Sequence, residues 1–258
     1  MTQPHESIAA AIRAAADAGR PALVAFMTAG FPRREDFPAQ LAAVAAAADV
    51  VEIGVPFSDP MADGMTIQRS SHAALVQGVS LKWILETLRT LADRPAAPLL
   101  LMSYLNPLLA YGLERLPAVA RAAGVAGFIV PDLPYEESGE LRAALDAEGL
   151  ALVQMVTPVT PPERLAMLCR AARGFVYAVT MTGTTGRSVA VPADVLEYMD
   201  RVRQASPVPV CAGFGIRSAE QVARMTGHVD GVVVGSALVE VLEQGGDPAA
   251  FLRGLRGG

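Results

Sequence analysis

A carboxylate inside an apolar strand, followed by a loop that carries two more, is the pattern in this sequence that could do acid–base chemistry. Glu52 lies in the apolar run Val50–Gly54, and Asp59 and Asp63 lie in the turn-rich segment that follows. Burying a charge costs free energy unless the charge is paired or neutralised. Desolvation raises the pKa of such a carboxyl group, as general acid–base catalysis requires. We therefore expect Glu52 to be a general acid/base and Asp63 to contact the substrate.

Each of these acids also has a structural interpretation. Glu52 could be paired with an arginine or a backbone donor, and Asp63, which precedes a glycine, could simply form a turn. Asp59 lies between Ser58 and Pro60, and we interpret it as a loop or interface residue rather than a catalyst.

Three glycine-containing segments follow successive predicted strands and could bind a phosphate. Glycine lets the backbone approach a ligand closely, and a helix N-terminus offers free N–H groups to an anion. Barrel enzymes frequently hold phosphate with the loops after strands seven and eight. The three segments are Thr182–Gly186, Ala212–Gly215 and Gly235–Ser236.

Aromatic residues are scarce, at 5% of the chain, so their positions are informative. Any one of them could simply fill the core. Together they could line an apolar pocket for a flat ring. The four that fall in strands or near strand ends are Phe26, Tyr104, Tyr177 and Phe214.

Several other chemistries lack the residues they need. The only lysine, Lys82, lies on the helical segment Leu81–Leu91, where it is poorly placed for a Schiff base. The histidines, His5, His72 and His228, form no metal-ligand pair at useful spacing, so we expect no metal. Carboxylate acid–base chemistry on a phosphate-bearing substrate remains.

Short apolar runs alternate with Ala-, Leu- and Arg-rich helical patterns along the chain. Eight strand–helix units in 258 residues predict an α/β fold, a closed (β/α)₈ TIM barrel that forms a single domain over residues 1–258. We expect an extra N-terminal helix, about Ser7–Ala18, to cover the N-terminal mouth of the barrel. The predicted strands are Ala22–Thr28, Val50–Gly54, Leu99–Ser103, Gly127–Val130, Ala151–Thr157, Phe175–Thr180, Val208–Ala212 and Gly231–Val234.

The composition restricts the class of protein. With 52% hydrophobic and 18% charged residues, the chain can bury a large core, which argues against global disorder. The net charge of −5 argues against a nucleic-acid partner or an anionic membrane surface. Cys169 and Cys211 are too few for a disulfide framework, and we interpret them as reduced core thiols of a cytoplasmic protein.

The chain resembles the alpha subunits of tryptophan synthase over nearly its whole length. The most specific match is Glu52–Pro60 with Ala62–Gly64 and Ile67–Gln68. The supporting segments are Phe26–Gly30, Tyr104–Pro107, Pro131–Pro134, Thr185–Gly186, Gly213–Ile216 and Gly235–Ala237.

The resemblance implies a retro-aldol cleavage of indole-3-glycerol phosphate to indole and glyceraldehyde 3-phosphate. It implies that Glu52 protonates indole C3 and accepts the glycerol hydroxyl proton, and that Asp63 accepts the indole N–H. Phe26, Tyr104, Tyr177 and Phe214 would then line the indole pocket. The residues implied for the phosphate site are Gly186, Gly213, Gly215, Gly235 and Ser236, with Thr185 on the loop that closes over the substrate.

The resemblance also implies a partner, a beta subunit in an α₂β₂ heterotetramer. That subunit uses pyridoxal phosphate, so no cofactor is expected in this chain. The residues implied for the interface are Pro56, Asp59, Pro60 and Asp132. Three positions depart from the usual family pattern, and they are Met65, Thr184 and Arg217.

Three alternatives remain open. A stand-alone indole-3-glycerol-phosphate lyase would work without a beta subunit. A different phosphate-binding barrel, such as an isomerase or prenyltransferase, would need another substrate to fit beside Glu52 and Asp63. A regulatory subunit would bind the ligand and activate a partner without turnover, although the intact acid pair argues against it.

Overall fold

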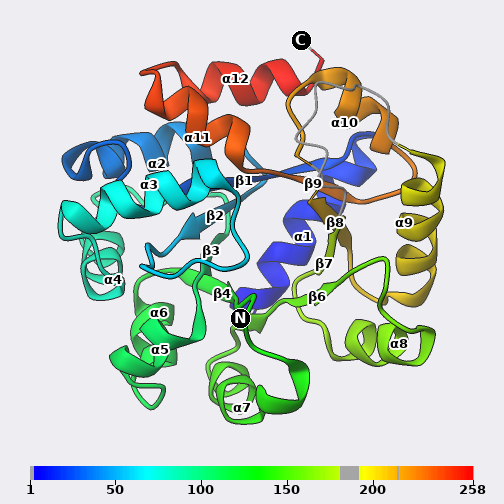
Figure 1. The fold of residues 1–258 in the computed structure, drawn as a ribbon, viewed down its shortest axis with the longest axis horizontal. Coiled ribbons are helices and arrows are strands. Elements are labelled where there is room, and N and C mark those ends of the chain that lie inside the picture. The colour runs from blue at the N-terminus through cyan, green and yellow to red at the C-terminus, as the bar shows by residue number, and fades with distance from the viewer. Residues whose placement is uncertain (1–2, 181–191, 214, 258) are drawn as a thin grey trace.

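The strands form a closed parallel barrel surrounded by helices in this computed structural model, which describes residues 3–180, 192–213 and 215–257 (Figure 1). The hydrogen-bonded order is β5-β4-β3-β2-β1-β9-β8-β7-β6. The strands are β1 (Ala22–Thr28), β2 (Val50–Gly54), β3 (Leu99–Met102), β4 (Val125–Ile129), β5 (Ala151–Leu152), β6 (Gln154–Val156), β7 (Val176–Val179), β8 (Val210–Gly213) and β9 (Gly231–Val234).

The predicted fifth strand, Ala151–Thr157, is divided into β5 and β6, so its prediction as one continuous strand was wrong. β5 pairs with β4 and β6 pairs with β7, and only Val153 separates them. Strands of a closed barrel are tilted and staggered, so the two halves of one strand reach different neighbours. The chain itself therefore closes the ring at this point, and the predicted (β/α)₈ barrel is confirmed.

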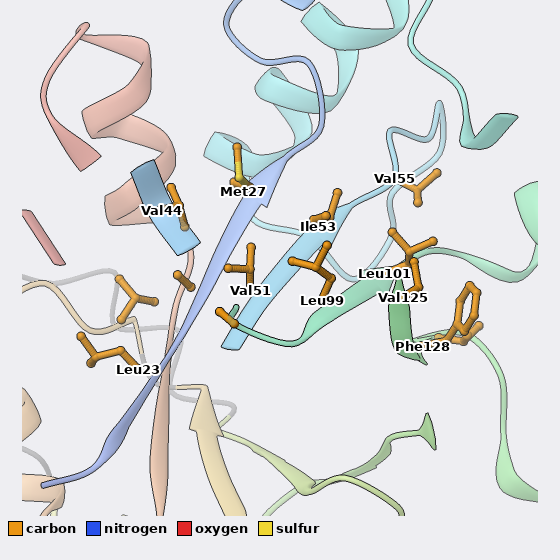
Figure 2. Packing of buried hydrophobic residues seen from close by; sticks show 14 of the residues in the cluster. Leu23, Met27, Val44, Val51, Ile53, Val55, Leu99, Leu101, Val125 and Phe128 are labelled. Carbon is orange, nitrogen blue, oxygen red and sulfur yellow. The ribbon is translucent and has the colours of Figure 1, made fainter. Parts of the chain in front are cut away.

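Alternate residues of each strand face the helices or the interior of the barrel. Val51 and Ile53 of β2 belong to the large buried cluster outside the strands, together with Leu99 and Leu101 of β3 (Figure 2). Val50, one residue earlier than Val51, packs instead in a separate interior cluster. Period-two alternation therefore directs Glu52, which shares the face of Val50, into the barrel.

The helices lie around the strands in chain order, and α1 crosses the centre of the ring (Figure 1). The α-helices are α1 (Pro4–Asp17), α2 (Phe37–Ala45), α3 (Met65–Val76), α4 (Leu81–Arg89), α5 (Leu105–Tyr111), α6 (Leu116–Ala122), α7 (Gly139–Ala147), α8 (Pro162–Ala171), α9 (Ala193–Ala205), α10 (Ala219–Met225), α11 (Ser236–Glu243) and α12 (Pro248–Leu255). Two 3₁₀ helices are η1 (Arg34–Asp36) and η2 (Tyr135–Glu137).

Helix α1 closes the N-terminal mouth, as the sequence predicts. Ile8 and Ile12 are fully buried and pack in the interior cluster with Ala22 and Val50, which are the first residues of β1 and β2. The helix begins three residues earlier than predicted, because a proline occupies its first turn and Gln3 forms a capping box. One end of the barrel is thereby sealed, so a ligand must enter at the other.

Both cysteines are free and buried, Cys169 in α8 and Cys211 in β8, as the sequence analysis expects. In the part of the chain that the structure describes, every helix is too short or too polar to cross a membrane.

The seal by α1 gives a stability prediction. Ile12→Ala leaves a cavity in a fully buried site and should lower the free energy of unfolding by about 2–5 kcal/mol in urea denaturation. The control is Val76→Ala on α3, where the side chain is 74% exposed and the change should stay within about 0.5 kcal/mol. Equal effects of the two substitutions would show that α1 does not seal the barrel.

Candidate active site

Glu52 lies inside the barrel, near the C-terminal end of β2. Its side chain is only 1% exposed, and it pairs in register with Phe26 of β1 and Leu100 of β3. Among the described residues, its Oε2 atom is buried without a hydrogen-bond partner. The structural interpretation of Glu52 as an acid paired with an arginine therefore does not hold for the described residues.

Burial determines the protonation of Glu52. Loss of solvation and, to a smaller extent, the nearby charge of Asp63 together raise its pKa to about 8. The carboxyl group is therefore mostly protonated at neutral pH. A neutral acid with an unpaired oxygen facing a cavity is poised to donate a proton.

Asp63 lies on the loop between β2 and α3 and is held by its surroundings. Burial raises its pKa and the nearby Tyr104 hydroxyl lowers it, so that the pKa lies at about 6. The Tyr104 hydroxyl accepts a hydrogen bond from the Ala62 backbone N–H at 2.8 Å, and Gln68 Nε2 donates to the Asp63 carbonyl oxygen at 2.8 Å. Asp63 is therefore mostly ionised at neutral pH and is positioned as an acceptor.

A cavity of about 170 Å³ joins the two acids with most of the other predicted site residues. It brings together residues from six separate segments of the chain at the open end of the barrel. Its lining is Phe26, Glu52, Asp63, Ile67, Met102, Tyr177, Gly213, Gly215, Val233, Gly235 and Ser236. Tyr104 lies beside it, in a small adjoining cavity that Phe26 and Asp63 also line.

Two glycines make room for the aromatic walls. A Cβ atom on Gly213 would lie 2.8 Å from the Tyr177 hydroxyl, and one on Gly54 would lie 2.5 Å from Phe26 Cζ. Real Cβ atoms do not approach other atoms so closely. The Tyr177 and Phe26 rings can therefore occupy these positions only because glycine has no side chain. Gly213, predicted for a phosphate site, therefore has a second role in seating Tyr177.

Gly215, Gly235 and Ser236 form the wall of the cavity that follows β8 and β9, which lie three and two strands from β2 in the barrel order. Gly215 has φ of +68°, a left-handed conformation that glycine adopts without strain. Gly235 is the N-cap of α11, and Ser236 is its first residue. This wall offers backbone N–H groups near a helix N-terminus, where an anion is favoured.

The sequence analysis did not identify Ile67, Met102 and Val233 as cavity residues. Met102 ends β3, Ile67 lies in the first turn of α3, and Val233 lies in β9 two residues before Gly235. Met102 and Val233 lie at or near strand ends, where barrel sites are built, so their positions could have identified them, whereas the position of Ile67 in α3 gives no such signal. Thr185, Gly186 and Phe214, which the sequence analysis assigned to substrate, lie outside the described residues.

The residues predicted for a partner interface lie on the loops after β2 and β4 and do not line the cavity of the acid pair. Asp59 and Asp132 are exposed, while Pro56 is buried and Pro60 is half-buried. Asp132 accepts a hydrogen bond from the Leu105 backbone N–H at 2.9 Å and thus holds the start of α5. A second cavity, of about 470 Å³, is lined by both Ala62 and Asp132 but contains neither catalytic candidate. The loops after β2 and β4 therefore lie next to each other.

In residues 3–180, 192–213 and 215–257, no group of three or more His, Cys, Asp or Glu residues is arranged to hold a metal ion. The described site therefore consists of one neutral acid, one ionised acid, aromatic walls and backbone N–H donors. Such a site can donate a proton, accept a second proton and bind an anion at opposite ends of one ligand.

Comparisons with known proteins agree on one family. A family profile described as Tryptophan synthase alpha chain matches residues 12–251. The Tryptophan synthase alpha chain of Solidesulfovibrio magneticus is 49% identical over 241 residues, covering 93% of this chain and 94% of the relative. A solved structure of Mycobacterium tuberculosis tryptophan synthase aligns with a TM-score of 0.88 and 35% identity, covering 97% of this chain and 96% of that chain. The tryptophan synthase subunit alpha of Legionella pneumophila aligns with a TM-score of 0.87 and 29% identity, covering 100% and 98%.

The raised pKa of Glu52 gives a prediction about stability against pH. Because the folded state holds this proton more tightly than the unfolded state, its contribution to stability is complete below about pH 4.5 and is lost as the pH rises to about 8. Glu52→Gln should remove this loss and be more stable than the unmodified protein at pH 8, by up to a few kcal/mol, with little difference at pH 4.5.

Urea denaturation at a series of pH values measures this effect. Glu137→Gln, at an exposed position, is the control and should keep the pH dependence of the unmodified protein. If Glu52→Gln follows the same pH profile as Glu137→Gln, Glu52 is not protonated by burial.

Proposed function

The chain belongs to the tryptophan synthase alpha chain family, and we propose that Glu52 and Asp63 perform the chemistry of that family in the cavity they share. It is an indole-3-glycerol-phosphate lyase of tryptophan biosynthesis. The observation that supports the residue assignment most strongly is the buried Glu52 carboxyl, which has an oxygen without a partner and faces the same cavity as Asp63.

Glu52 acts first as an acid and then as a base. Its proton passes to indole C3, which turns the indole ring into an electron-accepting indolenine cation. The resulting Glu52 carboxylate then takes the proton of the glycerol hydroxyl on the adjacent carbon. The carbon–carbon bond breaks as its electron pair moves into the ring, releasing indole and glyceraldehyde 3-phosphate. Glu52 ends protonated, as it began.

Asp63 stabilises the positive charge that forms on the ring. The hydrogen bond from the indole N–H to an ionised carboxylate is strongest when positive charge develops on that nitrogen. Its pKa of about 6 keeps it ionised at neutral pH, while the pKa of about 8 keeps Glu52 protonated. Two carboxyl groups with separated pKa values thus take two different roles.

The remaining site residues divide between the two ends of the substrate. Phe26, Tyr104 and Tyr177, with Phe214, are proposed for the indole ring. The proposed phosphate contacts are Gly213, Gly215, Gly235 and Ser236, with Thr185 and Gly186. The placement of Gly235 and Ser236 at the start of α11 supports this division, because a helix N-terminus favours negative charge.

We propose that a beta subunit docks on the face formed by the loops after β2 and β4, giving an α₂β₂ assembly with pyridoxal phosphate only in that partner. Asp59 and Asp132 are exposed there, and Pro56 and Pro60 shape the loop. Met61, on the loop after β2, is 86% exposed, and Met65, the first residue of α3, is 76% exposed. Exposed apolar side chains gathered beside charged ones are typical of interaction surfaces.

We also propose that the chain forms a single domain and that the protein is located in the cytoplasm.

A stand-alone lyase is the second candidate, and the exposed methionines argue against it. In a stand-alone enzyme, the exposed side chains of Met61 and Met65 would stay in contact with water. Measuring indole release with and without added beta subunit separates the two. High activity that the partner does not change would favour the stand-alone enzyme.

Substitution of the two acids tests the catalytic assignment. Glu52→Gln should lower kcat by several orders of magnitude, because one group supplies both the acid and the base. Asp63→Asn should lower kcat less, since it keeps the shape of the side chain and loses the charge. Both variants should stay folded by circular dichroism. Near-normal indole release by Glu52→Gln would refute the assignment.

The docking face has its own test. Asp59→Ala should weaken the affinity for the beta subunit about tenfold or more in calorimetry. Asp17→Ala, at an exposed position on α1 at the sealed end of the barrel, is the control and should bind as the unmodified chain does. Equal affinities of the two variants would place the partner elsewhere.

A further inference from the structure

The Glu240 carboxylate lies outside the cavity and connects three of the segments that form the walls of the cavity. Glu240, on α11, accepts hydrogen bonds from Arg217 Nη1 to Oε2 at 2.7 Å and from Arg217 Nη2 to Oε1 at 2.9 Å. Its Oε1 also accepts a hydrogen bond from Thr66 Oγ1 at 3.2 Å. None of these three residues lines the cavity, and the proposed function does not use them.

Each segment joined at Glu240 carries a wall of the cavity. Arg217 lies two residues after Gly215, on the loop between β8 and α10. Thr66 lies between Asp63 and Ile67, in the first turn of α3. Glu240 lies one helical turn after Ser236 on α11. The proposed phosphate contacts and the loop of the acid pair therefore meet at a single side chain.

Among the described residues of the loop between β8 and α10, only Arg217 forms a hydrogen bond with α11. Helices α3 and α11 are also joined by Arg69 and Glu243, through bonds of 2.9 Å and 2.7 Å. The loop that carries Gly215 is tied to α11 through Arg217. On its other side, the Arg217 backbone N–H donates to Gln221 Oε1 at 2.7 Å, within the capping box of α10. Two hydrogen-bonded anchors, one toward α10 and one toward α11, thus hold the loop together with Ile216, which is buried in the core.

Gly215 needs such anchors because its own surroundings do not fix it. It is exposed, and a Cβ atom added there would meet nothing within 4 Å. Glycine also has the widest choice of backbone conformations. Ile216 fixes one side of Gly215 in the core, and the bonds between Arg217 and Glu240 join the loop to α11 and so help to set the distance between Gly215 and Ser236.

We propose that Arg217, through Glu240, is a positioning residue that holds the loop of Gly215 against the start of α11, and so sets the affinity for the phosphate end of the substrate. This inference rests on the proposed function, because it assumes that the phosphate lies between Gly215 and Ser236. Three of the residues proposed for the indole ring, Phe26, Tyr104 and Tyr177, lie on other segments, so the affinity for the indole end should depend less on this pair than the affinity for the phosphate end does.

The test compares Arg217→Ala with the unmodified chain in steady-state indole release. We expect KM for indole-3-glycerol phosphate to rise about tenfold while kcat changes less than about threefold, because the acid pair stays in place. The inhibition constant of glyceraldehyde 3-phosphate should rise in parallel, and that of indole should rise less. Arg217→Lys, which keeps the charge and one N–H donor toward Glu240, should recover part of the affinity.

Arg224→Ala is the matched control. It removes another exposed arginine–glutamate pair, with Glu220 at 2.9 Å, from α10. Exposed ion pairs contribute little to stability, so both variants should fold and melt near the unmodified protein. The control should leave KM and both inhibition constants unchanged.

Three outcomes would overturn the proposal. They are a KM within twofold of normal for Arg217→Ala, an equal rise for Arg224→Ala, and a rise in the indole inhibition constant as large as that for glyceraldehyde 3-phosphate. Failure of the proposed function has a different signature, since the unmodified chain would then release no indole at all.

Discussion

The burial of one carboxyl group without a partner is the constraint on which the rest of this molecule depends. An ionised Glu52 would be costly in the barrel interior, so the fold keeps it protonated up to about pH 8. The same protonation makes it a proton donor at neutral pH. Asp63, less buried and close to the Tyr104 hydroxyl, stays ionised beside it. One difference in solvation thus separates an acid from an acceptor within a single cavity.

The barrel provides that difference through simple geometry. Period-two alternation along β2 turns Val50 and Glu52 inward and Val51 and Ile53 toward the helices. Below Glu52, Ile8 and Ile12 of α1 exclude water from the interior. Above it, the ends of the strands open into the cavity. The site is therefore dry on one side and accessible on the other, as a proton donor to an aromatic ring requires.

Much of this arrangement could be predicted from the sequence, because it depends on local patterns. The strands β1, β2 and β9 have the predicted bounds, and the acid in β2 is visible as a charge in an apolar run. The division of the fifth strand at Val153 was not predictable, since it depends on which neighbours a tilted strand reaches. Arg217 stood out in the sequence as a departure from the family pattern, but its partner Glu240 follows 23 residues later, across a strand and a helix. Such pairs form only when the barrel has closed.

The protonation state of Glu52 is the central claim, and infrared difference spectroscopy measures it most directly. Spectra of the unmodified chain minus Glu52→Gln, recorded from pH 5 to pH 10, isolate the carbonyl stretch of this one carboxylic acid. The protonated band should be present at pH 7 and should disappear with a midpoint near pH 8. A carboxylate band already complete at pH 6 would contradict this prediction.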